Sequence, residues 1–443
     1  MKKVLILTYY WPPSGGPGVQ RVLKFAKYLP EFGWQPIILT VKNGEYPALD
    51  HTLKKDIPKE CIVYKVKSLD PTGIYKRFVG MKKEDKIPVA ALAAENDNLG
   101  KRIAHWVRLN LFIPDAKVGL ISPFVKKAKE IIKEHHIDVI LASSPPHSLQ
   151  IAANRLSKKH HLPWVCDLRD PWTDIYHYDN IKRFILSDKF NHSLEHKVIT
   201  NADKLITVSP YFTRRFNHKA NRDDAVFIPN GFDRDDLDNR NAERKHDETF
   251  QISYVGNMSP NQNVEVFWQV IKDLSDKDAL FKERFKLCLV GDIQEKVKQS
   301  ISETGIDQYV SYLGYLPHNE AFGFIKNSDA LLFIVGRSKH NKGVLTGKIF
   351  EYFSTKNPIL SIGPTDGDAA KIISDVNKIS MRDYDDYDGL YHNLSTLFTA
   401  WKDKTIDNYR SGEDTMKYSR KALTGELVTV LNGLAAADKK KKK

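Results

Sequence analysis

The sequence predicts an α/β protein made of two doubly wound domains. Three observations support this fold class: the length of 443 residues, the alternation of short apolar runs with longer amphipathic segments, and a polar segment at residues 233–248 after which the alternation begins again. A chain of this length usually folds as two or three domains. Its 41% hydrophobic and 28% charged residues exclude a disordered chain, a collagen-like fibre and a polytopic membrane protein.

The first half of the chain alternates predicted strands with predicted helices. Strands are expected at residues 4–8, 36–41, 139–142, 164–167, 204–208 and 226–228. Helices are expected at residues 18–29, 123–134, 148–159 and 190–199. Apolar strands that alternate with helices are typical of a parallel sheet covered on both faces.

The second half repeats this pattern. Strands are expected at residues 250–255, 286–290, 310–313, 330–335 and 358–362, with helices such as 264–274 and 348–353 between them. We therefore expect two Rossmann-like domains that face a central cleft. Their expected bounds are an N-terminal domain at 1–232, a linker at 233–248, a C-terminal domain at 249–410, a helix at 411–434 that returns to the N-terminal domain, and a lysine-rich tail at 435–443.

Charge and cysteine content narrow the function classes. The net charge is +13, of which five charges come from the C-terminal lysines. The remaining excess is moderate and suits a protein that works near anionic lipid or an anionic substrate. The three cysteines lie far apart and show no metal-ligand spacing or disulfide framework, which favours a reducing cytoplasm. The N-terminal apolar run is too short for a signal peptide, and no run reaches the length of a spanning helix.

Residues 68–117 interrupt the alternation and contain no clear strand. Within this insert, residues 99–113 carry the basic side chains Lys101, Arg102 and Arg108 and an apolar face that includes Trp106. One interpretation is an ordinary surface helix packed on its domain. The other is an interfacial helix whose indole enters the lipid while the basic groups meet anionic headgroups.

Ligands of doubly wound sheets bind beyond the carboxyl ends of the strands, so the candidate residues are those that follow strands. Gly15 and Gly16 follow the first strand and open a helix, where backbone amides attract an anion. Arg21 stands where a dinucleotide fingerprint needs glycine, and no acidic residue follows the second strand at residues 40–42, so the sequence disfavours a nicotinamide cofactor. His147 and Asp170 follow two later strands, and each faces either a ligand or its own loop.

The second half offers Lys348 and Glu351 on one face of a predicted helix. A cation in the first turn is disfavoured by the helix dipole unless an anion is bound, so Lys348 indicates a phosphate site. The alternative is a solvent-exposed ion pair. Asp233 and Asp235 form an Asp-x-Asp pattern, which we interpret as a charged turn, and no metal site is expected.

Five segments taken together resemble glycosyltransferase family 4, the retaining enzymes of bacterial surface-polysaccharide assembly that have the GT-B fold. They are YYWPPSGGPGVQR, FIPDAKVGL, SSPPHS with PWVCDLRDPWTD, IPNGFD, and TGKIFEYFSTKNPILSIGP. The resemblance implies a nucleotide-sugar donor held mainly by the C-terminal domain and an acceptor held by the N-terminal domain. It implies no metal and no cofactor.

The resemblance also assigns roles to particular residues. Gly15 and Gly16 would lie against the donor diphosphate, and Gly256 and Asn257 would form the glycine turn that opens the donor domain. Lys348 would bind phosphate and Glu351 the ribose, while Asp170 or His147 would lie near the sugar and the acceptor.

Two departures from the family pattern affect the donor site. Gly343 replaces the first of two glutamates, so the sugar cannot be inferred. The basic pair that usually follows the Gly256 turn is also missing, and we expect Arg337 and Lys348 to neutralise the diphosphate instead.

The leading hypothesis is therefore a cytoplasmic glycosyltransferase, peripheral at the inner face of the cytoplasmic membrane, that uses a glycan or polyprenyl-diphosphate-linked acceptor. The alternatives are a nucleotide-sugar epimerase of the same architecture and a non-catalytic nucleotide-sugar-binding protein. A nucleic-acid partner is disfavoured because basic and acidic residues are interspersed outside the tail.

Overall fold

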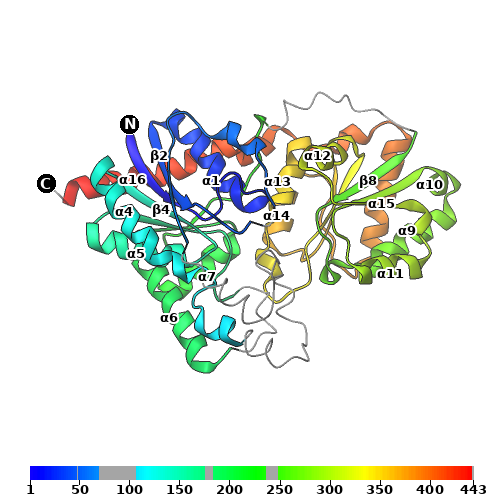
Figure 1. Ribbon diagram of the computed structural model, residues 1–443. Helices are drawn as coiled ribbons and strands as arrows, with labels where there is room; N and C mark the ends of the chain where they lie inside the picture. The colour runs from blue at the N-terminus through cyan, green and yellow to red at the C-terminus, as the bar shows by residue number, and fades with distance from the viewer. Residues whose placement is uncertain (47, 69–105, 175–182, 236–247, 442–443) are drawn as a thin grey trace. The chain divides into compact units, whose positions relative to one another are not determined.

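The computed structural model describes the chain except residues 47, 69–105, 175–182, 236–247 and 442–443. The chain divides into two compact units (Figure 1). Unit 1 comprises Met1–Pro229 and Leu423–Lys443, and unit 2 comprises Asn230–Ala422. Most of the predicted linker, and the part of the insert that precedes Trp106, lie outside the described residues.

Unit 1 contains a seven-stranded parallel sheet in the order β3-β2-β1-β4-β5-β6-β7. Its strands are β1 (Lys2–Leu7), β2 (Trp34–Val41), β3 (Ile62–Val66), β4 (Val139–Ser144), β5 (Trp164–Leu168), β6 (Lys204–Thr207) and β7 (Val226–Phe227). Strand order reverses beside β1, since β2 and β4 are its two neighbours. In sheets of this kind the loops beyond the carboxyl ends near such a reversal form the ligand site.

Both faces of this sheet are covered by helices. Leu5 and Leu7 of β1 pack into a core with α4 (Ile121–His135), α5 (Ser148–His160), α6 (Ile185–Asn201) and α7 (Pro210–Ala220). Val4 and Ile6 point to the opposite core, which contains α1 (Pro17–Tyr28) and the C-terminal helix α16 (Arg420–Lys441). Because alternate side chains of a strand face opposite sides, burial on both faces explains why residues 4–7 of β1 are all apolar.

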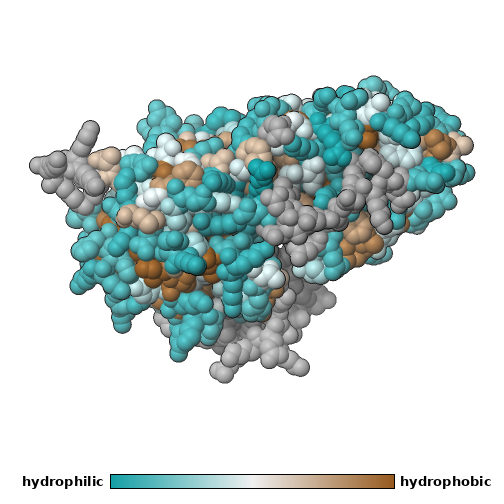
Figure 2. Space-filling view, turned by 90° about the horizontal axis from the view of Figure 1, so that it is seen from above, coloured by the Kyte–Doolittle hydropathy of each residue, from teal (hydrophilic) through white to brown (hydrophobic). Residues whose placement is uncertain are grey.

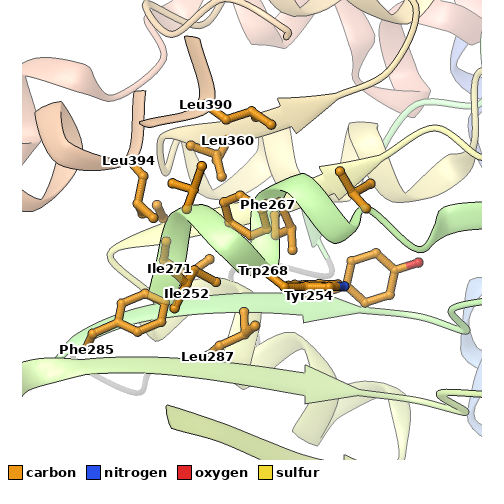
Figure 3. Packing of buried hydrophobic residues seen from close by; sticks show 14 of the residues in the cluster. Ile252, Tyr254, Phe267, Trp268, Ile271, Phe285, Leu287, Leu360, Leu390 and Leu394 are labelled. Atoms are coloured by element: carbon orange, nitrogen blue, oxygen red, sulfur yellow. The ribbon is translucent and has the colours of Figure 1, made fainter. Parts of the chain in front are cut away.

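Unit 2 contains a five-stranded parallel sheet in the order β10-β9-β8-β11-β12. Its strands are β8 (Phe250–Val255), β9 (Phe285–Val290), β10 (Val310–Gly314), β11 (Ala330–Ile334) and β12 (Ile359–Ile362). Its helices are α9 (Glu265–Lys277), α10 (Ala279–Arg284), α11 (Glu295–Thr304), α12 (His318–Asn327), α13 (Gly347–Thr355), α14 (Asp368–Ser374) and α15 (Tyr387–Lys402). Figure 3 shows Phe267 and Trp268 of α9 packed among Ile252, Leu360, Leu390 and Leu394.

The outer surface seen in Figure 2 is mostly hydrophilic, with separate apolar areas. This agrees with the ordinary composition of the chain, since the described units bury most of their large apolar side chains. No helix among the described residues combines the length and the apolar character needed to cross a bilayer.

The predicted fold class is confirmed, but several elements differ from the prediction. Strand β3 was not expected, because an edge strand that carries Lys65 and is only partly buried has a weak apolar signal. Helix α6 begins at Ile185 rather than 190, with apolar residues in its first turn. Helix α16 begins at Arg420 rather than 411, because the short 3-10 helix Glu413–Tyr418 precedes it.

A buried ion pair joins three parts of unit 1. The Arg21 guanidinium of α1 donates to both carboxylate oxygens of Asp167 on β5, and the closest ion-pair distance is 2.9 Å. The same guanidinium donates to the Pro229 carbonyl oxygen at 2.8 Å, and both charged side chains are only 1% exposed. Ser143 on β4 donates a further hydrogen bond to Asp167 at 2.7 Å. Arg21, which replaces the fingerprint glycine, is therefore a structural residue.

We predict that Arg21→Met lowers the free energy of unfolding by about 3–5 kcal/mol, because it leaves the Asp167 carboxylate buried without its cation. The exposed pair of Lys127 and Glu130 provides a matched control. Lys127→Met should change stability by at most about 1 kcal/mol. Urea unfolding of both variants measures the difference, and equal effects would contradict a special role for the buried pair.

Candidate functional site

In unit 1, Arg169 follows β5 and joins the start of α1 to the end of β4 and the loop after it. Its Nη1 donates to the Gly18 carbonyl oxygen at 2.6 Å, and its Nη2 donates to the Pro145 carbonyl oxygen at 3.0 Å. Its backbone N–H and its Nε both donate to the Ser144 carbonyl oxygen. Since β1, β4 and β5 are adjacent and parallel, Arg169 fixes the relative positions of the loops at their carboxyl ends.

The glycine loop after β1 places backbone at the start of α1. Gly16 is exposed, has φ of 81° and lies at the N-cap of α1, a conformation that favours glycine. The Gly15 N–H donates to the Ala48 carbonyl oxygen at 2.8 Å, and a Cβ on Gly15 would lie 3.3 Å from that of Asp50. This loop presents the N-terminus of α1 at the carboxyl edge of the sheet, a favourable position for an anion.

His147 is buried at the N-cap of α5 and stacks on Trp172, with ring centroids 4.8 Å apart and an interplanar angle of 9°. Burial, reinforced by the nearby Arg169 charge, lowers the pKa of His147 to about 3. Its Nδ1 has no hydrogen-bond partner among the described residues. The neutral ring is therefore suited to hydrogen bonding with a ligand hydroxyl and unsuited to acting as a charged acid.

Asp115 holds the start of α5 in place. Its carboxylate accepts hydrogen bonds from the backbone N–H and the hydroxyl of Ser148, at 2.9 and 2.8 Å, and from the backbone N–H of Lys117 at 2.9 Å. Because Ser148 is the first residue of α5, this carboxylate also fixes the position of the adjacent His147.

The two carboxylates of the DLRD segment have different roles. Asp167 is buried in the ion pair with Arg21, so it is unavailable for a ligand. Asp170 is exposed, one residue after Arg169, whose charge it attracts. Of the two, only Asp170 is placed where a ligand can reach it.

In unit 2, Lys348 lies in the first turn of α13 beside the glycine turn that follows β8. Its Nζ is 3.6 Å from the centroid of the Tyr254 ring. Gly256 has φ of 131°, and a Cβ there would lie 2.8 Å from Cε of Lys348, so glycine is required for both conformation and space. The half-buried ammonium has no hydrogen-bond partner among the described residues. Burial lowers the pKa of Lys348 to about 7, and the Glu351 carboxylate acts in the opposite direction.

The loops after β8, β9 and β10 are tied together by backbone contacts. The Gly256 N–H donates to the Val290 carbonyl oxygen at 2.8 Å, and the Gly291 N–H donates to the Gly314 carbonyl oxygen at 2.7 Å. A Cβ on Gly291 would lie 2.5 Å from the Gly256 carbonyl oxygen. The Asn257 side chain accepts a hydrogen bond from the Asp292 N–H at 3.2 Å. These hydrogen bonds fix the loops at the sheet edge beside Lys348. The glycines in these loops place no side chain at that edge.

The structure brings Gly256, Lys348 and Glu351 together, whereas Arg337 has another partner. The Arg337 guanidinium lies 2.8 Å from Asp385 and 4.3 Å from the centroid of the Tyr384 ring. The Arg337 guanidinium would have to give up its ion pair with Asp385 in order to neutralise a diphosphate. Gly343, at the position of the missing glutamate, is buried in a short 3-10 helix.

The basic amphipathic segment is described only from Trp106. Residues 106–111 are helical, and Trp106 is half exposed while Leu109 and Asn110 are buried. Arg108 is partly buried, and its Nη1 has no partner among the described residues. Lys101 and Arg102 lie outside the described residues.

Sequence reasoning missed several residues that shape the site. Trp172 and Asp115 lie within the segments that carry the family resemblance, so their place in those segments was an available signal. Tyr254 is a strand residue, and only the fold shows that its ring faces Lys348. In the described part of the chain, no three His, Cys, Asp or Glu side chains gather as a metal site requires.

We predict that His147 makes unit 1 sensitive to acid. With a folded pKa of about 3 and an unfolded value of about 6.5, the unfolded state binds the extra proton, so stability is full above pH 6.5 and falls as the pH decreases toward 3. At pH 5 the loss is about 2 kcal/mol. His147→Phe keeps a stacked ring and should lose less stability than wild type between pH 7 and 5.

The exposed residue His196 supplies the control, since His196→Phe should retain the acid response of the wild type. Urea unfolding at both pH values measures the response. An identical response in His147→Phe and wild type would show that His147 is protonated in the folded state.

Comparison with known proteins agrees with the fold described above. The model of Glycosyltransferase Family 4 matches residues 82–236, and the model of Glycosyl transferases group 1 matches residues 235–345. No curated protein matches the chain by sequence.

Solved structures share the fold along nearly the whole chain. Sucrose-phosphate synthase from Thermosynechococcus elongatus matches with a TM-score of 0.63 and 13% identity, covering 99% of this chain and 100% of that one. A TarM variant from S. aureus, in complex with fondaparinux, α-GlcNAc-glycerol and UDP, matches with a TM-score of 0.57 and 11% identity, covering 98% and 100%.

A putative UDP-N-acetylglucosamine 2-epimerase from Listeria monocytogenes matches with a TM-score of 0.53 and 10% identity, covering 97% of this chain and 96% of that one. These structures establish the GT-B architecture. The two consecutive family models together match residues 82–345, and they identify the chain as a glycosyltransferase with a family 4 region followed by a group 1 region.

Proposed function

We propose that this glycosyltransferase moves a sugar, with retention of configuration, from a nucleotide-sugar donor to a glycan or lipid-linked acceptor in cell-surface polysaccharide synthesis. The observation that carries the donor assignment is the position of Lys348, a half-buried cation beside the Gly256 turn and the N-terminus of α13. Retention of configuration and a role in surface-polysaccharide synthesis are proposed from the sequence resemblance. Both go beyond what family membership establishes.

Three features of the proposed donor site favour the binding of a diphosphate. It supplies the anion that an ammonium without a hydrogen-bond partner requires, it is favoured by the helix dipole, and it fits against the glycine backbone. Lys348 then binds phosphate, and Glu351, one turn later on α13, accepts hydrogen bonds from the ribose hydroxyls. UDP in the TarM complex and the synthases among the structural neighbours support a nucleotide-sugar donor.

The chemistry requires stabilisation of the departing diphosphate. Glycosyl transfer places negative charge on that group, and a preorganised cation with a helix N-terminus stabilises it as it forms. The leaving phosphate accepts the proton of the acceptor hydroxyl, so no metal and no side-chain base are needed in this proposal. His147, neutral and facing the loops at the carboxyl edge of unit 1, orients the acceptor, and Asp170 contacts the sugar or the acceptor.

An epimerase of the same architecture is the second candidate, because the Listeria structure shares the fold. An epimerase converts its sugar nucleotide with no acceptor present. Incubation of UDP- and GDP-sugars with and without membrane lipid extract separates the two, with nucleoside diphosphate release and product NMR as readouts. Acceptor-dependent release supports the transferase, conversion of donor alone supports the epimerase, and binding without either reaction indicates a non-catalytic protein.

We predict that nucleoside diphosphate binding at pH 8.5 takes up close to one proton. With a pKa of about 7, Lys348 is mostly neutral in the free protein, and the bound anion favours the ammonium. Lys348→Met should abolish this uptake and weaken binding about 10- to 100-fold, the range for a hydrogen bond to a charged group. Calorimetry in two buffers of different ionisation enthalpy measures both quantities.

Lys371→Met is the matched control, because Lys371 is an exposed lysine of the same unit on α14. It should leave affinity and proton uptake unchanged. Glu351→Ala should weaken nucleotide binding without altering proton uptake at pH 8.5. Unchanged affinity in both Lys348→Met and Glu351→Ala would remove the donor assignment.

We predict that Asp170→Asn lowers kcat at least tenfold while nucleotide affinity changes less than twofold, since Asp170 lies in unit 1 and the nucleotide is held mainly by unit 2. His147→Ala should behave in the same way. Asp223→Asn removes an exposed carboxylate of unit 1 elsewhere and should have no effect on either quantity. Parallel losses of affinity and turnover would place Asp170 in the donor site instead.

A further inference from the structure

The geometry points to a lipid-docking surface on unit 1. We infer that six exposed apolar side chains enter the headgroup region of an anionic membrane: Trp106, Leu111, Phe184, Ile185, Leu186 and Phe190, here called the apolar patch. Each is between 50% and 69% exposed. The inference deepens and rests on the proposed function, because it names the surface at which a lipid-linked acceptor is met.

The apolar patch is formed by two segments of the chain that are hydrogen-bonded to each other. Asn110, on the helix of residues 106–111, accepts a hydrogen bond from the Phe184 N–H at 2.7 Å through its side chain. Its carbonyl oxygen accepts a second one from the Ser187 hydroxyl at 3.1 Å. Figure 1 shows this short turquoise helix beside α6. The apolar side chains of the two segments therefore belong to one surface.

Helix α6 exposes apolar residues and buries polar ones over its first turns. Ile185, Leu186 and Phe190 are exposed, whereas Asn191 and Glu195 are buried. A helix that packs on a sheet and faces water shows the opposite distribution. A contiguous exposed group of large apolar side chains marks an interaction surface.

The charge at the edge of the patch favours an anionic lipid surface. Lys189 is exposed between Leu186 and Phe190. The partly buried Arg183 directly precedes Phe184, and the partly buried Arg108 lies between Trp106 and Leu111 in sequence. The one acidic residue on this part of α6, Asp188, lies 3.4 Å from His192. Basic groups around an apolar, Trp-containing surface match anionic headgroups above acyl chains. A symmetric contact with a second copy would instead bring the same basic groups together.

The patch is linked to the acceptor side of the site. Asn191, which follows Phe190, accepts a hydrogen bond from Trp172 Nε1 at 2.9 Å. Trp172 in turn stacks on His147. Two side-chain contacts, Asn191 to Trp172 and Trp172 to His147, therefore connect the patch to the ring that we assign to the acceptor. This arrangement suits an acceptor whose reactive sugar stays close to the lipid surface.

Sedimentation of the full chain with vesicles tests the inference. The wild type should bind vesicles of equal phosphatidylglycerol and phosphatidylcholine and be released by 0.5 M NaCl, since exposed charges are screened by about that ionic strength. Leu186→Ser with Phe190→Ser should lower the vesicle partition coefficient at least tenfold. Lys189→Gln should lower it about fivefold, the effect of one basic residue near an anionic surface.

Two controls separate the patch from general surface effects. Lys197→Gln removes an exposed lysine from the same helix, and Phe32→Ser removes an exposed aromatic side chain of the same unit. Both should sediment like wild type, and all variants should keep wild-type nucleotide affinity. Failure of the wild type to bind these vesicles, or unchanged binding of the double variant, would overturn the inference.

A wild type that is dimeric in solution, with monomeric patch variants, would assign the patch to self-association and would also overturn the lipid inference. The vesicle assay needs neither donor nor acceptor. Vesicle binding without glycosyl transfer would therefore reject the proposed function alone, and transfer without vesicle binding would reject the docking surface alone.

Discussion

The ion pair between Arg21 and Asp167 is the interaction on which the arrangement of unit 1 depends. It joins α1, β5 and the chain at Pro229, where unit 1 gives way to unit 2. A charge buried this deeply is tolerated only with a well-oriented partner, so the three segments have one arrangement in which both ions are satisfied. The glycine loop before α1 and the Arg169 loop after β5 are therefore held at one edge of the sheet.

The candidate site residues of unit 1 and those of unit 2 differ in how their charged groups are partnered. In unit 1 the groups at the edge of the sheet are either already paired or kept neutral, as Arg169 and His147 illustrate. In unit 2 the Lys348 ammonium is partly desolvated and lacks a hydrogen-bond partner among the described residues. The arrangement in unit 1 suits a neutral hydroxyl group, and the arrangement in unit 2 suits a phosphate. Glycosyl transfer requires both, one for the acceptor hydroxyl and one for the diphosphate of the donor.

The sequence predicted the class of fold because strands buried on both faces give continuous apolar runs, as in β1 and β4. It failed for β3, whose edge position leaves it partly exposed, and for the start of α6, where apolar residues face outward. It predicted that Lys348 and Glu351 share a helix, and both lie on α13, while their roles in donor binding stay a prediction. It could not show that Tyr254 faces Lys348 or that Trp172 stacks on His147, because both contacts join residues from distant parts of the chain.

The C-terminal helix has a consequence for the order in which the protein is made. Unit 1 contains Leu423–Lys443, so the whole of unit 2 is synthesised between its two parts. Leu427 and Leu431 of α16 complete the core that also contains Val4 and Ile6, and Asn432 accepts a hydrogen bond from Trp34 Nε1 at 3.2 Å. Until this helix leaves the ribosome, one face of the first sheet to be translated is covered by α1 but lacks the part of its cover that α16 supplies. Unit 2 can thus fold during translation before the N-terminal unit is complete, and the nascent N-terminal sheet is the surface that a chaperone would have to protect.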